Sequence, residues 1–167
     1  LDAVAPTNFF WTNPEALRLS LSSHGFSVLL GLQNWLRDLA AGEVQMVEPD
    51  AFTVGRDLAA TPGQVVLRNE LLELIQYAPV TEQVHATPIV LVAPWINKFY
   101  IMDMSPHNSL VRYLLGQGFT VFITSWKNPG AEARAVTLDD YLLKGLRPAL
   151  EAARAICGVN QVHATGY

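Results

Sequence analysis

Charged residues and cysteine are both scarce in this sequence of 167 residues. Only 16% of the residues are charged, against roughly 25% in an ordinary soluble domain, whereas 50% are hydrophobic. A disordered chain needs low hydrophobicity and a high net charge, so this composition excludes disorder over most of the length. The length itself is sufficient for one domain with a full hydrophobic core.

The sequence also lacks the patterns of membrane spans and secretion signals. Its longest apolar run, around residues 89–93, is far shorter than the roughly 20 residues that cross a bilayer. Nothing like a signal peptide stands at Leu1 to Asn8. We therefore expect an intracellular protein.

Basic clusters and metal-ligand spacings are absent from the sequence as well. The 11 Lys and Arg residues stand singly, so the charge pattern does not favour a nucleic-acid partner. The single cysteine, Cys157, cannot form an internal disulfide, and no Cys and His residues have the spacing of a zinc site. We expect neither a nucleic-acid partner nor a metal site.

Two helices are predicted near the start of the chain. The first follows Asn13, a suitable capping residue, has Pro14 at its first position and runs to about Ser22. The second has apolar residues at intervals of three and four over 28–39 and ends near Gly42. Such a helix more often docks on its own protein than on a lipid-like surface, which is the alternative.

After an irregular connection, the sequence alternates between predicted strands and helices. The expected strands are 65–69, 71–77, 89–92, 119–124 and 161–165, and the expected helices begin near 110 and 137. Residues 89–92 are all apolar, as in a strand buried on both faces. Thr137 and Asp140 have capping-box spacing, and Pro148 should kink the helix that they begin. The alternation after residue 79 predicts parallel strands with helical crossovers, an α/β fold.

Three short motifs connect the sequence with a known family. They are Gly55-Arg56-Asp57-Leu58-Ala59 with Thr61-Pro62-Gly63, then Pro94-Trp95-Ile96-Asn97-Lys98-Phe99-Tyr100-Ile101-Met102-Asp103, then Ser125-Trp126-Lys127-Asn128-Pro129. In this order and spacing they resemble the poly(3-hydroxyalkanoate) synthases, which polymerise hydroxyacyl-CoA into storage polyester. The resemblance extends from Asn8 to Tyr167 and is closest to the class I enzymes, which prefer short hydroxyacyl units.

The resemblance implies a fold and a division of the chain. Residues 55–167 would be the first part of a catalytic domain, the N-terminal half of an α/β-hydrolase-like fold, and residues 1–54 a helical N-terminal region. In that family a strand leads into a nucleophile elbow, G-x-C-x-G, and Gly166 and Tyr167 match its first two positions. The sequence stops one residue before the nucleophile. The catalytic Cys, His and Asp are therefore expected beyond its end, and this chain alone is expected to be inactive.

The implied reaction is acyl transfer, in which a cysteine thiolate attacks the thioester of (R)-3-hydroxyacyl-CoA and CoA leaves. No cofactor is implied, because the CoA thioester is the substrate. In α/β-hydrolases one oxyanion donor comes from the loop after the third strand, which is 89–92 here. The backbone N–H groups of Trp95 and Ile96 are the candidates, since Pro94 has none. The alternative is that these residues only turn the chain off the strand.

Further residues around this loop are candidates for lining a pocket or supporting the loop. Asn97, Lys98, Tyr100 and Asp103 follow it in the sequence. Lys98 has two alternatives, a CoA phosphate or a structural contact, either with Asp103 or with the backbone. Trp126 follows the next predicted strand, at the carboxyl edge where open α/β sheets bind ligands.

The only thiol is not a candidate nucleophile. Cys157 ends a predicted helix, where the helix dipole disfavours a thiolate, whereas an elbow nucleophile follows a strand directly. The four histidines have no carboxylate or second ligand at a meaningful spacing. We expect no catalytic residue within this chain.

The resemblance also implies partners and a location. The partners would be hydroxyacyl-CoA, the growing polyester, the surface of a polymer granule and a second copy of the full-length chain. The location would be the cytoplasm, on polyester storage granules. Two alternatives stay open: another α/β-hydrolase, an esterase or depolymerase with G-x-S-x-G, or a non-catalytic module that attaches to granules through its N-terminal helices, with Trp35 and its neighbours.

Overall fold

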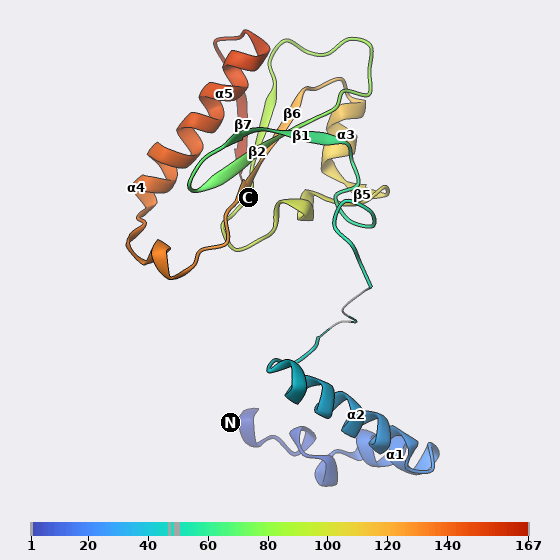
Figure 1. The fold of residues 1–167 in the computed structure, drawn as a ribbon. Coiled ribbons are helices and arrows are strands. Elements are labelled where there is room, and N and C mark those ends of the chain that lie inside the picture. Colours follow the sequence, from blue (N-terminus) through green and yellow to red (C-terminus); the bar gives the residue numbers. More distant parts are fainter. Residues whose placement is uncertain (1, 47, 49–50, 167) are drawn as a thin grey trace. The chain divides into compact units, whose positions relative to one another are not determined.

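A computed structural model describes residues 2–46, 48 and 51–166 of the chain. The chain divides into two compact units, Leu1–Ala51 and Phe52–Tyr167 (Figure 1). The expected boundary between a helical N-terminal region and a catalytic domain, at residues 54 and 55, stays a prediction.

The first unit is helical. Short 3-10 turns, Asp2–Val4, Pro6–Asn8 and Phe10–Thr12, precede α1 (Pro14–Ser22) and α2 (Phe26–Ala41). Asn13 caps α1 as predicted, because its Oδ1 accepts the N–H groups of Glu15 and Ala16 at 3.0 and 3.2 Å. Gly42 ends α2 with a φ of +73°, a conformation that favours glycine. Both predicted helices are confirmed. Within the described ranges, no helix combines the length and apolar character that a bilayer crossing requires.

The second unit is built on a five-stranded sheet in the order β1–β2–β6–β3–β7. Its strands are β1 (Gly63–Arg68), β2 (Leu72–Tyr77), β3 (Ile89–Val92), β6 (Val121–Trp126) and β7 (His163–Gly166). β1 and β2 form an antiparallel hairpin, and β2 is antiparallel to β6. β3 lies parallel to both β6 and β7. The predicted α/β class and its parallel crossovers are confirmed within a mixed sheet.

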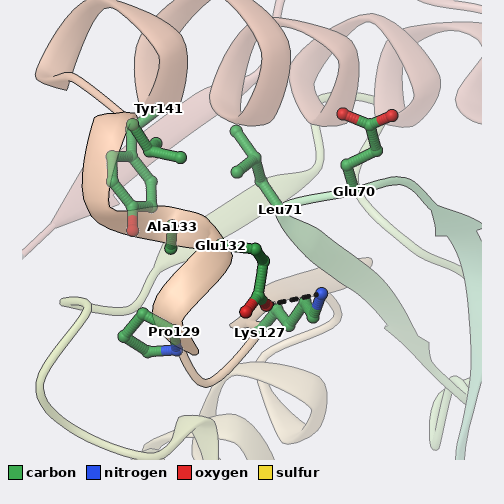
Figure 2. A pocket seen from close by; sticks show the side chains of 8 residues that line it. Glu70, Leu71, Lys127, Pro129, Glu132, Ala133 and Tyr141 are labelled. Atoms are coloured by element: carbon green, nitrogen blue, oxygen red, sulfur yellow. Dashed lines mark ion pairs between the residues drawn. The ribbon is translucent and has the colours of Figure 1, made fainter.

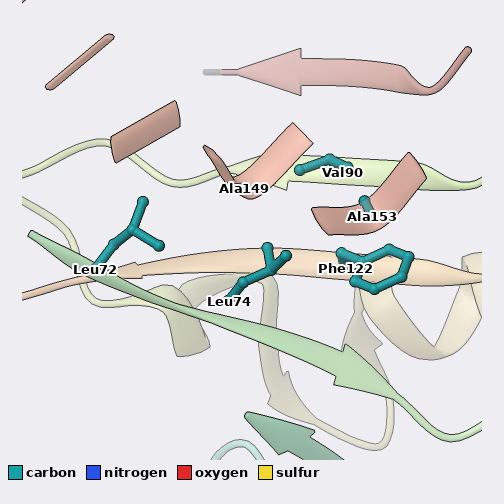
Figure 3. Close-up of a cluster of buried hydrophobic side chains, with 6 residues drawn as sticks. All are labelled: Leu72, Leu74, Val90, Phe122, Ala149 and Ala153. Carbon is teal, nitrogen blue, oxygen red and sulfur yellow. The ribbon is translucent and has the colours of Figure 1, made fainter. Parts of the chain in front are cut away.

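Two helical connections cover opposite faces of this sheet (Figure 1). One is α3 (Leu110–Gly116); the other runs through α4 (Leu138–Asp140) and a π-helical segment, Tyr141–Leu146, into α5 (Arg147–Cys157). Ala149 and Ala153 of α5 pack on Val90 and Phe122 (Figure 3). The side chains of α3 pack instead on Leu91 and Ile123. Neighbouring residues of β3 and β6 thus point to two separate cores, which confirms the prediction that these apolar strands are buried on both faces.

Some boundaries differ from the sequence prediction. β6 begins at Val121 and not at 119, because Gly118, with a φ of +80°, and Phe119 still belong to the turn that ends α3. β6 also extends to Trp126, which was expected after the strand, because Trp126 pairs with Leu72 of β2. β7 begins at His163 and not at 161. A short hairpin of β4 (Asp103–Ser105) and β5 (Asn108–Ser109) was not predicted at all.

Pro148 acts on the winding of the helix before it. Its missing N–H leaves the carbonyl of Lys144, four residues earlier, without its usual helical donor. That carbonyl accepts Nδ2 of Asn69 at 3.0 Å, and the segment just before the proline is π-helical. Where a kink was expected, the structure thus has a change from π-helical to α-helical hydrogen bonding. Thr137 and Asp140 form the predicted capping box at the start of α4.

Asn69 joins the β1–β2 hairpin to this helix, and its replacement should destabilise the second unit. Its Oδ1 accepts hydrogen bonds from the N–H groups of Leu71 and Leu72 at 2.9 and 3.0 Å. Its Nδ2 donates to the carbonyl of Lys144. We expect Asn69→Ala to lower the free energy of unfolding by about 1–2 kcal/mol. Asn69→Ser keeps an acceptor for the turn and should cost less. Thermal unfolding of both variants measures the difference, and equal stabilities would contradict a stabilising role of the acceptor for the N–H groups of Leu71 and Leu72.

Candidate functional site

Ala93, the residue after β3, makes hydrogen bonds through both its N–H and its carbonyl with side chains of β6. Its N–H donates to Oγ1 of Thr124 at 3.0 Å, and its carbonyl accepts the indole N–H of Trp126. The backbone register of β3 and β6 extends to the pair Leu91 and Ile123, so these side-chain bonds continue the connection beyond it. Ala93 and Thr124 are both buried. We call this pair of bonds the Ala93 clamp; it fixes where the following loop leaves the sheet.

The loop after the clamp carries the candidate oxyanion donors. Within the described residues, the N–H groups of Trp95 and Ile96 make no hydrogen bond to another group of the chain. The Ile96 side chain is 93% exposed, whereas that of Trp95 is 49% exposed. Two adjacent backbone donors in the loop after β3 therefore have no partner among the described residues.

Three aromatic rings gather beside this loop. The ring of Tyr141 lies 4.9 Å from that of Trp95 and 5.3 Å from that of Trp126, measured between centroids. Gly145 makes the approach of the π-helical segment possible, because a Cβ atom there would lie 2.7 Å from the Trp126 ring. Aromatic pairs at such separations favour tilted and edge-on geometries, as found here.

The aromatic rings wall a cavity of about 240 Å³, which we call the β7-end cavity. Besides the rings, Val92, Ala93, Pro94, Leu142, Leu146 and Gly166 line it. Gly166 is the last residue of β7 and pairs with Val92 in parallel register. Tyr167, the second position of the expected elbow motif, lies outside the described residues. The cavity thus lies at the carboxyl ends of β3, β6 and β7, where α/β sheets bind ligands.

Lys98, Asn97 and Tyr100 lie around a neighbouring cavity, also of about 240 Å³, to which Trp95 and Trp126 contribute as well. Nζ of Lys98 donates to Oδ1 of Asn128 at 2.6 Å. The expected alternative contact of Lys98 with Asp103 is therefore wrong. The Lys98–Asn128 bond ties the loop after β3 to the loop after β6.

Asp103 is buried and lines neither cavity. Its carboxylate accepts Oγ1 of Thr61 at 2.8 Å, the Thr61 N–H at 3.2 Å and Oγ of Ser109 at 2.6 Å. Its carbonyl accepts the N–H of Ala59 at 2.8 Å. Asp103 thus joins the first sequence motif, around residues 55–63, to the second.

The thiol of Cys157 lies away from this site, in contact with the core beneath α5. Burial raises the pKa of Cys157, so the thiol is kept protonated rather than activated. No group of three or more His, Cys, Asp or Glu residues in the described part of the chain is arranged to hold a metal ion.

Sequence reasoning missed Thr124, Tyr141 and Gly145. The hydroxyl of Thr124 directly after the apolar residues 121–123 was a signal, as was a glycine within a helical stripe. Their partners, however, lie far away in the sequence. Only the fold brings them together.

Comparisons with known proteins agree with the resemblance of the motifs. The family profile described as "Poly-beta-hydroxybutyrate polymerase (PhaC) N-terminus" matches residues 1–114. The poly(3-hydroxyalkanoate) polymerase subunit PhaC of Cupriavidus necator is 45% identical over 167 residues, which is 100% of this chain and 28% of that protein. The poly(3-hydroxyalkanoate) polymerase of Methylorubrum extorquens is 43% identical over 100% of this chain and 28% of its own length.

Polymerase 1 of Ectopseudomonas oleovorans is 44% identical over 99% of this chain and 30% of its own length. The chain therefore spans less than a third of these relatives. The profile match covers more than half of the chain, and the similarity to the polymerases continues through the clamp and the aromatic rings. The chain belongs to the poly-beta-hydroxybutyrate polymerase (PhaC) N-terminus family.

Proposed function

We propose that this chain is part of a poly(3-hydroxyalkanoate) synthase, an acyltransferase that polymerises (R)-3-hydroxyacyl-CoA and releases CoA. The observation that carries the proposal is the β7-end cavity, an apolar space lined by Trp95. An aliphatic acyl group fits such walls, and in this proposal its carbonyl accepts the N–H groups of Trp95 and of Ile96, the next residue of the loop. The names of the relatives support the same activity.

The arrangement of strands supports an α/β-hydrolase-like fold for the whole domain. β3, β6 and β7 are parallel, have helices on both faces and end around the same cavity. In that fold the nucleophile follows a strand at a sharp turn. We place the nucleophilic cysteine directly after Tyr167, with its His and Asp partners further along the full-length chain.

In this mechanism the thiolate attacks the thioester carbonyl, and negative charge develops on the carbonyl oxygen. The N–H groups of Trp95 and Ile96 stabilise that charge because the Ala93 clamp fixes the start of their loop. The carbon–sulfur bond to CoA then breaks, and the histidine supplies a proton to the leaving thiolate.

The proposed partners beyond the substrate are the polymer granule surface and a second copy of the full-length chain, in the cytoplasm. Exposed apolar side chains of α2, among them Leu29, Trp35 and Leu39, support attachment to an apolar surface. The 167-residue chain by itself has no nucleophile in this proposal and should be inactive.

The product of the reaction tests the function. A protein with this segment, extended to the length of its relatives, should convert (R)-3-hydroxybutyryl-CoA to polyester with one CoA released per unit incorporated. The same assay on the 167-residue chain should release no CoA. Release of CoA with free 3-hydroxybutyrate instead of polyester would contradict the proposal and indicate a hydrolase.

A further inference from the structure

We infer that a second cavity, which shares Tyr141 with the β7-end cavity, is an acyl subsite that holds the hydroxyl end of the growing polyester. The inference rests on the proposed function, which it deepens. The cavity measures about 280 Å³ (Figure 2), and we call it the side pocket. Tyr141 lines both the side pocket and the β7-end cavity.

The interior of the side pocket is apolar and comes from separate elements. Leu71 precedes β2, Ala133 belongs to the 3-10 turn Ala131–Ala135, and Val136 ends that turn. The carbonyl of Leu71 accepts the N–H of Lys127 at 2.8 Å, which ties the loop after β6 to the hairpin. Leu71, Ala133 and Tyr141 gather in one part of Figure 2, with a charged pair below them. Aliphatic groups can therefore be buried against these walls.

The charges around the side pocket favour a neutral occupant over the phosphates of CoA. Nζ of Lys127 lies 3.3 Å from the carboxylate of Glu132, and both side chains are more than half exposed, at 60% and 63%. Glu70 adds a second carboxylate to the lining. The one ammonium of the lining is already paired with a carboxylate, whereas a polyester segment carries no charge and needs no ammonium.

Elongation requires two acyl units side by side. The hydroxyl oxygen of the chain end attacks the enzyme-bound thioester; a carbon–oxygen bond forms, the carbon–sulfur bond breaks, and the hydroxyl proton passes to the released sulfur. The β7-end cavity accommodates the unit that carries the thioester, and the side pocket accommodates the attacking chain. Tyr141, whose ring lies beside those of Trp95 and Trp126, lines both cavities.

Filling the side pocket should therefore slow elongation but leave acylation intact. In the full-length polymerase, rapid mixing with (R)-3-hydroxybutyryl-CoA separates the first CoA released per active site from the steady-state rate. We expect Ala133→Leu to lower the steady-state rate about tenfold, with an unchanged first release. Ala135→Leu, at an exposed position of the same 3-10 turn, is the matched control and should change neither.

Val136→Phe narrows the same pocket from another wall and should reproduce the effect of Ala133→Leu. The amplitude of the first release counts the folded, acylatable enzyme. An equal fall of both phases in both pocket variants, or no change in either phase, would overturn the subsite. A parent enzyme that releases no CoA would instead refute the proposed function, so the two failures are distinguishable.

Discussion

Replacement of Ile96 by proline should lower kcat of the full-length polymerase by about a hundredfold or more, with little change in KM. Proline removes the backbone N–H that we propose as an oxyanion donor. Charge on the carbonyl oxygen develops only on the way to the transition state, so the lost bond affects turnover rather than substrate binding. Steady-state CoA release at several substrate concentrations separates the two constants.

Ile96→Ala is the matched control, because it keeps the N–H and shortens a side chain that is 93% exposed. Its kcat should stay within about twofold of the parent value, as is usual for surface changes of small free energy. Thermal unfolding of both variants shows whether the proline disturbs the fold beyond the loop. Equal losses in the alanine and proline variants, or normal turnover in the proline variant, would exclude the N–H of Ile96 as a donor.

Local sequence patterns were sufficient for most of the fold because the signals are short-ranged. The wholly apolar run of β3 predicted burial on both faces, and Asn13 and Gly42 marked helix ends by their own conformational preferences. The start of β6 was misplaced because Phe119 is as apolar as the strand, although it closes a turn. The β4–β5 hairpin was missed because it is short and its first residue, Asp103, is held by Thr61, a contact between distant segments.

For the candidate site too, local sequence patterns predicted the position, but contacts between distant residues could not be predicted. Its position at the strand ends followed from the alternation of strands and helices, and Trp126 was a candidate on that ground. What Trp126 does could not be predicted, since its partner is the carbonyl of Ala93, in another strand connection. The same holds for Tyr141. In the sequence it is one more apolar residue of a helical stripe, and only the fold of the π-helical segment brings its ring against Trp95.

Thr124 provides the sharpest test of the Ala93 clamp. Thr124→Val keeps the shape of the side chain but leaves the buried N–H of Ala93 without its acceptor, at a cost of about 1–3 kcal/mol in stability. A displacement of about 1 Å in a catalytic group can lower a rate by about a hundredfold, and we expect a fall in kcat of that order. Thr124→Ser retains the hydroxyl, so its kcat should stay close to the parent value.

The loss of stability and the loss of kcat in Thr124→Val, compared with each other, show what the clamp does. Both measurements belong on the full-length polymerase, with kcat expressed per folded molecule from the unfolding curve at the assay temperature. If Thr124→Val lost stability but kept its kcat, the clamp would serve only the fold of β3 and β6. The other outcome is that Thr124→Val loses kcat while Thr124→Ser keeps it, at similar stability. The hydroxyl would then set the direction in which the chain leaves β3. The candidate donors at Trp95 and Ile96 depend on that direction, because they are the second and third residues after the clamped Ala93.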